Sequence, residues 1–243
     1  VTDMAKKNRR IGLGIMGFGD MLYQLGIKYD SKEGFDTAEQ TMGFINEEAY
    51  KMSQELAEEK GEFLNYPKSV FAKQTMHSEA QSHGIGKKMR NAALTTVAPT
   101  GSISMMMDCS SGVEPNFALA YIKQDKDGVQ YQYLNKYFEK ALNDLNLSSD
   151  EMEEIKQEVI EKGTIQHLTN LPQELRDTFV VAMDISGRGH MEMQAAFQRH
   201  VDNSISKTIN LPNEATREEV GEWFIDAWKL GCKSCTVYRE GSR

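Results

Sequence analysis

The sequence is poor in cysteine and proline, and it has no long apolar run. It contains three cysteines and five prolines in 243 residues. The cysteine spacing does not suggest a disulfide framework, so a reducing, cytoplasmic setting is expected. No apolar run approaches membrane-spanning length and no signal peptide is visible, which argues against contact with a membrane.

The chain also lacks an excess of positive charge. Its formal net charge is −8 at pH 7, which argues against a nucleic-acid surface. A mononucleotide needs only a local anion site, so nucleotide binding stays open. The composition is that of an ordinary globular protein, and the chain begins at Val1 without a methionine and stops just after a strand-like run. We therefore interpret residues 1–243 as a fragment truncated at both ends.

The stretch from residue 91 to 115 joins a buried type of strand to a loop of small polar residues. Residues 91–98 are small, apolar and β-branched, and Pro99 then ends the strand because it has no N–H to donate. A strand, a tight loop and a helix start together form an anion site, most often for phosphate. A plain N-capped turn would have the same residue types. The candidate residues are Pro99, Thr100, Gly101, Ser102, Ile103 and Ser104.

Three further patterns suggest chemistry but have a simpler interpretation. Gly12-x-Gly14-x-x-Gly17 has the letters of the dinucleotide fingerprint, but a polar segment precedes it, so a glycine-rich packing helix is favoured. Cys232-x-x-Cys235 suits a redox pair or half a zinc site, yet residues three apart on a strand face opposite ways. His77 and His83 lie in a loop-like run, where a surface loop is favoured over a metal site.

The hydrophobic periodicity predicts an α/β protein. A long amphipathic helix over 36–60 ends at Gly61, a hairpin joins 117–123 to 129–134, and a charged helical segment over 135–163 is capped inside by Ser148-Ser149-Asp150. The last part predicts parallel strands with helical crossovers. Its expected strands are Phe179–Ile185, Ser206–Leu211 and Cys232–Tyr238, and its expected helices are Gly189–Val201 and Thr216–Leu230.

Four collinear stretches give the chain a family resemblance. The first is Asn-Ala-x-Leu-Thr-x-x-Ala-Pro-Thr-Gly-Ser-Ile-Ser from residue 91, followed by Ser-Ser-Gly-Val-Glu-Pro to residue 115. The others are Asn-Arg-Arg-Ile-Gly-Leu-Gly-Ile-Met-Gly-Phe over 8–18, the motifs within 193–208, and those within 230–239. Together they resemble the catalytic subunit of ribonucleotide reductase, most closely its class II, adenosylcobalamin-dependent branch.

The resemblance implies a fold and a set of partners. Family members form a ten-stranded α/β barrel from two halves of five parallel strands, and residues 1–243 would be the C-terminal half. The family's loop grips the substrate phosphates at the positions of Pro99–Ile103, with Ser104 adjacent. The implied partners are a ribonucleotide substrate, the N-terminal half of the barrel and a thiol reductant, and the implied cofactor is adenosylcobalamin.

The resemblance also implies that this chain carries no catalytic residue. The family's radical cysteine lies in Asn-x-Cys-x-Glu, a motif that this sequence does not contain. Class I members have two adjacent tyrosines where this chain has Thr236-Val237, which fits class II. The expected function is thus part of a reductase that makes deoxyribonucleotides by radical chemistry. A non-catalytic nucleotide-binding, phosphate-binding or assembly module is the alternative.

Overall fold

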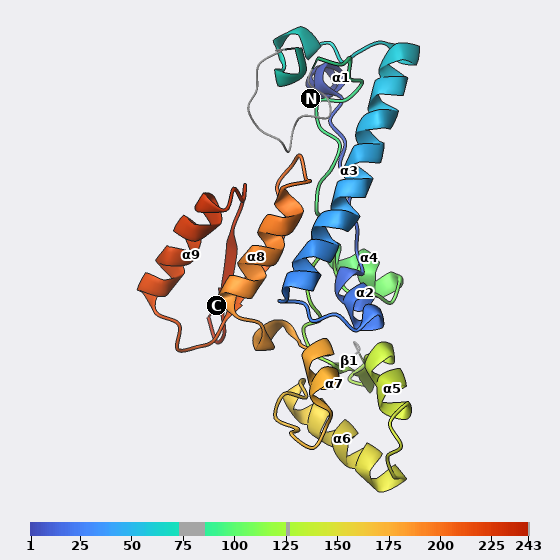
Figure 1. Cartoon of the computed structure of the whole chain (residues 1–243), viewed down its shortest axis with the longest axis vertical. Helices are drawn as coiled ribbons and strands as arrows, with labels where there is room; N and C mark the ends of the chain where they lie inside the picture. Colours follow the sequence, from blue (N-terminus) through green and yellow to red (C-terminus); the bar gives the residue numbers. More distant parts are fainter. Residues whose placement is uncertain (73–85, 125–126, 243) are drawn as a thin grey trace.

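The computed structural model of the chain describes residues 1–72, 86–124 and 127–242. Helices dominate the described residues, and the strands are short (Figure 1). The elements in chain order are α1 Thr2–Asn8, α2 Phe18–Leu25, α3 Lys32–Lys60, the 3-10 helices η1 Tyr66–Lys68 and η2 Val70–Ala72, α4 Gly101–Met106, β1 Ala120–Gln124, β2 Gln130–Leu134, α5 Lys136–Asn143, α6 Ser149–Lys162, α7 Gln173–Thr178, η4 Ala182–Asp184, α8 Gly187–Gln198, β3 Thr208–Leu211, α9 Arg217–Lys229 and β4 Thr236–Arg239.

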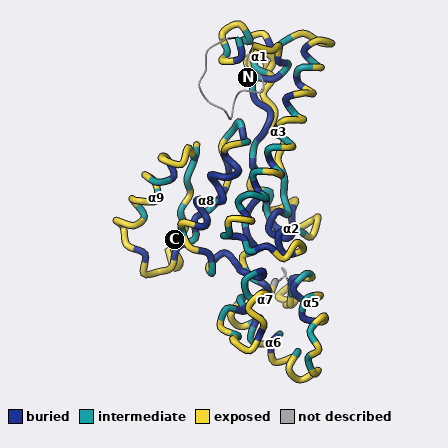
Figure 2. The backbone as a smooth tube through the Cα atoms, viewed as in Figure 1, coloured by how far each residue is buried: buried dark blue, intermediate teal, exposed yellow. Residues whose placement is uncertain are grey.

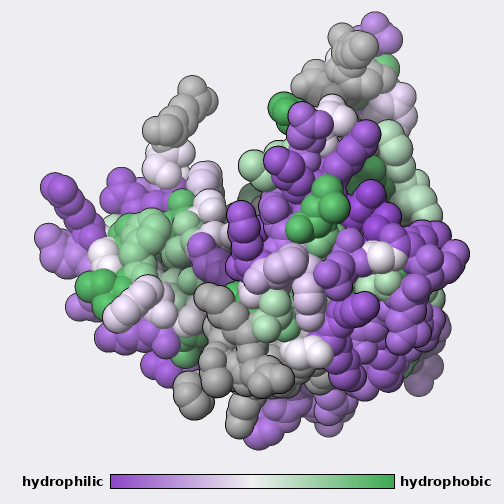
Figure 3. Space-filling model, turned by 90° about the horizontal axis from the view of Figure 1, so that it is seen from above, coloured by the Kyte–Doolittle hydropathy of each residue, from purple (hydrophilic) through white to green (hydrophobic). Residues whose placement is uncertain are grey.

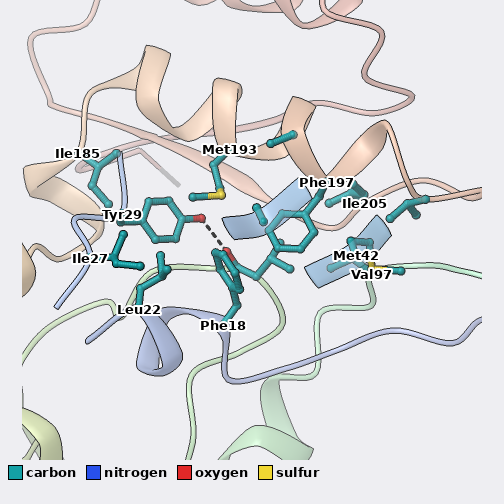
Figure 4. Packing of buried hydrophobic residues seen from close by; sticks show 14 of the residues in the cluster. Phe18, Leu22, Ile27, Tyr29, Met42, Val97, Ile185, Met193, Phe197 and Ile205 are labelled. Atoms are coloured by element: carbon teal, nitrogen blue, oxygen red, sulfur yellow. Dashed lines mark hydrogen bonds between the residues drawn. The ribbon is translucent and has the colours of Figure 1, made fainter. Parts of the chain in front are cut away.

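The main core lies where α2, α3 and α8 meet. Phe18 of α2 contacts Phe197 of α8 edge to face, with ring centroids 4.8 Å apart, and both side chains are almost fully buried. Tyr29 lies in the same cluster, and its hydroxyl donates to the carbonyl of Val113 at 2.6 Å (Figure 4). A buried tyrosine hydroxyl needs such an acceptor, so this bond ties the segment around Val113 to the core.

The predicted long helix is confirmed as α3, which begins a few residues earlier than expected. Ser31 caps it by accepting a hydrogen bond from the N–H of Gly34 at 3.0 Å, as N-cap serines do. Met42 is fully buried while Glu47 and Glu48 are exposed. The periodic pattern therefore placed the helix correctly.

The C-terminal part confirms the predicted parallel pairing of 206–211 with 232–238. β3 pairs with β4 in parallel, with Thr208 opposite Thr236, and α9 forms the crossover. The capping box of α9 is present, because Thr216 accepts from the N–H of Glu219 and the carboxylate of Glu219 accepts from the N–H of Thr216. Two isolated parallel bridges, Leu13 to Thr95 and Val97 to Ile205, extend this layer.

The expectation of five parallel strands in half a barrel is only partly confirmed. Within the described ranges the regular strands form one parallel pair and one antiparallel pair, and they close no barrel. The predicted strand over 91–98 is an extended segment with single bridges. One reason is that the carboxylate of Asp202 accepts from the N–H groups of Leu94 and Thr95, at 2.7 and 3.3 Å, so side-chain bonds replace part of a ladder.

The predicted strand over 179–185 is wrong. The chain makes the 3-10 turn η4 there, although its apolar side chains are buried as expected. The N–H of Val181 donates to the carboxylate of Asp184 at 2.9 Å, and the N–H of Ala182 donates to the carbonyl of Asn116 at 2.9 Å. A local aspartate thus satisfies backbone groups that a strand would have paired.

The glycine-rich segment is not helical before residue 18, contrary to the expected packing helix. The segment around Leu13 instead runs extended beside Thr95, and α2 begins at Phe18. A Cβ atom at Gly14 would lie 2.2 Å from the carbonyl oxygen of Thr96. The glycine therefore allows close backbone approach, as expected for packing, but between extended segments rather than helices.

The predicted hairpin and the predicted helical segment after it are confirmed, and together with α7 they pack around a second apolar cluster. β1 and β2 pair antiparallel, and Gly128 between them has a φ of 82°. α5, α6 and α7 lie close to β1 in the lower part of Figure 1, around a cluster that includes Phe138 and Val159. Ser148 and Gly163 begin and end α6 with a capping box and a left-handed residue, as predicted.

The α9 helix differs from α8 in how much apolar surface it exposes. Figure 2 shows α8 largely buried and α9 largely exposed. Phe224, Ile225 and Trp228 on α9 are 49%, 54% and 77% exposed, and hydrophobic patches are visible in Figure 3 on the side where α9 lies in Figure 1. No helix in the described part of the chain is both long enough and apolar enough to span a membrane.

Candidate functional site

A cavity of about 630 Å³ opens between α4, the β1–β2 hairpin and β3. Its lining combines hydrogen-bonding groups with exposed apolar and aromatic side chains, a mixture typical of small-molecule sites. The lining residues used below are Asp20, Gly101, Ser104, Asp108, Cys109, Ser111, Glu114 and Thr208. Two of the predicted loop residues, Gly101 and Ser104, belong to this wall.

The loop that enters α4 has a fixed and unusual backbone. Thr100 is its N-cap and has a left-handed conformation, with φ 54° and ψ 17°, which non-glycine residues seldom adopt. Its hydroxyl oxygen accepts a hydrogen bond from the N–H of Gly112 at 2.7 Å. This bond holds the two ends of the stretch from Thr100 to Gly112 together.

The first turn of α4 presents backbone donors to its surroundings. The N–H groups of Gly101, Ser102 and Ile103 have no hydrogen-bond partner among the described residues, and all three residues are exposed. Pro99, also exposed, precedes them without an N–H of its own. Unpaired N–H groups at a helix start attract anions.

Ser104 is placed differently from the other predicted loop residues. It is buried, and its hydroxyl donates to the carbonyl of Gly101 at 3.2 Å and lies 2.8 Å from the hydroxyl of Ser111. Its N–H donates to the carbonyl of Thr100 at 2.9 Å. Ser104 therefore stiffens the loop from inside.

Two carboxylates form hydrogen bonds around the segment that follows α4. Asp20 is buried, and its oxygens accept from the N–H of Ser110 at 2.7 Å and from the amide of Asn116 at 2.9 Å. Asp108 contacts Lys136 at 2.7 Å, and the hydrogen bond from Lys136 holds the pKa of that carboxyl below its usual range. Both carboxylates are thus engaged in contacts within the protein.

The cysteine beside the cavity is not activated. Burial, and secondarily the charge of Asp20, raises the pKa of the Cys109 thiol above its usual value. A raised pKa keeps the thiol protonated and unreactive near neutral pH.

A buried ion pair supports another part of the wall through Glu114, and no sequence motif indicated a role for it. Lys207 Nζ lies 2.9 Å from Glu114 Oε2 and 2.9 Å from His190 Nδ1, and the side chain of Lys207 is 0% exposed. Burial, and secondarily the charge of Lys207, lowers the pKa of His190 to about 3. His190 is therefore neutral, and its Nε2–H donates to the carbonyl of Ala182 at 2.9 Å.

A sequence signal for this lysine exists. Ile205, Lys207, Ile209 and Leu211 alternate along the segment that leads into and through β3, and all four are buried. A lysine at an inward position of such a strand requires a buried partner. That partner is Glu114, so two of the motifs that gave the resemblance meet in one ion pair.

The Asp202-Asn203 motif has a structural role. Beside its bonds to Leu94 and Thr95, the carboxylate of Asp202 accepts from the hydroxyl of Tyr50 at 2.8 Å. The side-chain amide of Asn203 donates to the carbonyl of Thr95 at 2.7 Å. The motif therefore clamps the extended segment that leads into the loop.

The other candidate ligands do not form a site in the described residues. No group of three or more His, Cys, Asp or Glu side chains there could hold a metal ion. Cys232 and Cys235 precede β4 instead of lying on it, and both pack on the apolar cluster of α8, β3 and α9. Burial raises the pKa of the Cys232 thiol to about 11. His77 and His83 lie outside the described residues.

Comparison with known proteins gives one consistent family. The sequence profile described as "Ribonucleotide reductase, barrel domain" matches residues 1–238. The vitamin B12-dependent ribonucleoside-diphosphate reductase of Thermoplasma acidophilum is 40% identical over 243 residues, which cover 100% of this chain and 30% of that protein. The enzyme of the same name from Mycobacterium tuberculosis H37Rv is 38% identical over 241 residues, covering 99% and 32%.

A solved structure agrees with the sequence comparisons. The Actinobacillus ureae class Id ribonucleotide reductase alpha subunit superposes with a TM-score of 0.78 at 25% identity, covering 99% of this chain and 41% of that one. The chain spans about a third of the length of the curated relatives it matches.

Proposed function

Because the chain belongs to the ribonucleotide reductase barrel family, we propose that it forms the substrate-phosphate wall of a vitamin B12-dependent reductase that makes deoxyribonucleotides. The observation that carries the proposal is the set of open N–H groups at Gly101, Ser102 and Ile103, beside a cavity of about 630 Å³. The relatives' names supply the reaction and the dependence on vitamin B12.

The loop binds phosphate through its backbone. It contains no lysine or arginine, so the N–H groups, the helix dipole and the hydroxyl of Ser102 supply the attraction. Charge-assisted hydrogen bonds of this kind contribute roughly 1.5–3 kcal/mol each. Hydrogen bonds of Thr100 and Ser104 fix the conformation of the loop, and Pro99 begins it.

The partners follow from the same proposal. The other half of the barrel packs against this chain, and the exposed apolar side chains of Phe224, Ile225 and Trp228 favour such a protein neighbour. A thiol reductant returns the enzyme to its reduced state after turnover. The three free cysteines of this chain fit a reducing cytoplasm.

The cavity does not fit adenosylcobalamin, so no reaction step is assigned to that cofactor here. The cavity holds about 630 Å³, and the cofactor is much larger than a mononucleotide. We propose that the complete enzyme binds it outside this cavity. The chain's own residues bind and orient the substrate, and its cysteines are not radical carriers.

The test is a reductase assay with and without the rest of the catalytic subunit. The 243-residue chain is co-expressed with a preceding half that carries Asn-x-Cys-x-Glu, and this reconstituted subunit is supplied with adenosylcobalamin and dithiothreitol. We expect deoxyribonucleotide from the reconstituted subunit and none from the chain alone. Product from the purified chain alone, or none from a folded reconstituted subunit, would contradict the proposal.

A further inference from the structure

Lys207 is anchored on all sides inside the protein. Its Nζ donates to Glu114 Oε2 at 2.9 Å, to His190 Nδ1 at 2.9 Å and to the carbonyl of Thr208 at 3.2 Å. An ammonium group has three hydrogens, so each of them has an acceptor. Burial lowers the pKa of Lys207 and the nearby charge of Glu114 opposes that shift.

Glu114 connects this buried lysine to the cavity. Its Oε1 accepts from the N–H of Thr208 at 2.7 Å, and its Oε2 accepts from Lys207. The side chain is 25% exposed and belongs to the lining. Each carboxylate oxygen accepts more than one hydrogen bond, so lone pairs remain for a group inside the cavity.

The energetic cost of burying the Lys207–Glu114 pair favours a role for it other than stabilising the fold. Taking a lysine out of water costs several kcal/mol, and apolar replacements of buried ion pairs are often as stable. Here the pair places Glu114 at the cavity wall, and the hydrogen bonds from Lys207 and from the N–H of Thr208 fix the orientation of its carboxylate. We propose that Glu114 is a ligand-binding carboxylate that accepts a hydrogen bond from a sugar hydroxyl of the bound nucleotide.

The position of Glu114 in the cavity selects this ligand group. A carboxylate repels phosphate, and Lys207 already balances its charge, so a neutral donor fits best. Gly101 and Glu114 line the same cavity, and the Thr100–Gly112 hydrogen bond ties their segments together at 2.7 Å. A ligand that contacts both the loop and Glu114 carries an anion at one end and a hydroxyl at the other, as the phosphoribosyl part of a nucleotide does. The inference rests on the proposed function.

The test compares two ligands and two variants of the reconstituted subunit. Inorganic pyrophosphate probes the loop alone, while cytidine diphosphate probes the loop and Glu114 together. The variants are Lys207→Met and the double variant Lys207→Met with Glu114→Gln. The two variants differ only at residue 114. Because Lys207 is replaced in both, neither contains a buried ammonium group without a partner. Glu222→Gln, at an exposed position of α9, is the matched control.

We expect the double variant to bind cytidine diphosphate at least fivefold more weakly than Lys207→Met does, because a charge-assisted bond becomes a neutral one. Pyrophosphate affinity should differ by less than about twofold between the two variants. Equal losses for both ligands, or no loss for either, would overturn the role of Glu114. If Gly101→Val leaves pyrophosphate binding unchanged, the phosphate loop itself is refuted, which is a separate result. Circular dichroism confirms that each variant is folded.

Discussion

Residues 94–97 and residues 99–103 follow one another along the chain, yet their backbones are used in opposite ways. The first segment is held from several sides, by Asp202, by Asn203 and by bridges to Leu13 and Ile205. The second segment leaves three consecutive N–H groups without a partner among the described residues. The rigid segment positions the open one, an arrangement that the proposed phosphate-binding role of the loop requires.

Asp202→Ala should have the largest effect, and it should act on stability. The substitution leaves the buried N–H groups of Leu94 and Thr95 without their carboxylate acceptor. Each buried unsatisfied donor costs about 1–3 kcal/mol, so we expect a loss of about 3 kcal/mol or more in the free energy of unfolding. Urea denaturation measures it. Asp226→Ala, at a partly exposed site on α9, should change it by less than about 0.5 kcal/mol.

The next prediction compares two glycine substitutions, one at a glycine that packs against residues 94–97 and one at a glycine within residues 99–103. Gly14→Ala should cost about 2 kcal/mol or more, because its new Cβ would lie 2.2 Å from the Thr96 carbonyl oxygen and the backbone would have to move. Gly101→Ala should be neutral within about 0.5 kcal/mol, since nothing lies within 4 Å of a Cβ there and its φ is not positive. Thermal and urea unfolding test both. Equal losses of stability would show that the backbone around Gly101 is packed as tightly as the backbone around Gly14.

Stability should fall as the pH falls from 7 to 5, in part because of His190. Burial lowers the pKa of His190 to about 3 in the folded state, whereas the unfolded chain has the ordinary value near 6.5. The unfolded state therefore binds more protons between these values, and stability is lost as the pH falls below about 6.5. The contribution at pH 5 is about 2 kcal/mol.

His190→Asn isolates this effect. The asparagine oxygen can replace Nδ1 as the acceptor for Lys207 but does not titrate. The variant should lose less stability than the wild-type chain between pH 7 and pH 5, by about 2 kcal/mol. Urea denaturation at the two pH values measures the difference. Identical pH slopes would contradict the assignment of a neutral, buried imidazole.

Sequence patterns predicted those parts of the fold whose signals are local. The periodicity of α3, the helix that begins after Thr216 and the β1–β2 hairpin depend on neighbours in the sequence, and all three are confirmed. Residues 179–185 are apolar enough for a strand, but the carboxylate of Asp184 satisfies the backbone there. The strand was wrong because periodicity measures burial and not hydrogen-bond partners.

The candidate site also has one part that a local sequence signal indicates and one part that depends on residues far apart in the sequence. The loop over 99–104 was identifiable because its small residues, proline and glycine are contiguous. The ion pair of Glu114 and Lys207 joins residues 93 positions apart, and His190 approaches from a third segment. Such a cluster depends on long-range packing, and only the inward position of Lys207 in its strand pattern indicated that a partner was needed.

The central claim is that the open N–H groups of the loop bind the substrate phosphates. The most direct test is the dissociation constant of a ribonucleotide for the reconstituted subunit with Gly101→Val and with Ser102→Ala. The valine side chain would crowd the anion, whereas Ser102→Ala removes one hydroxyl donor. We expect Gly101→Val to raise the dissociation constant at least tenfold, or about 1.4 kcal/mol, and Ser102→Ala to raise it only a few-fold. A folded Gly101→Val variant that binds substrate normally would contradict the account.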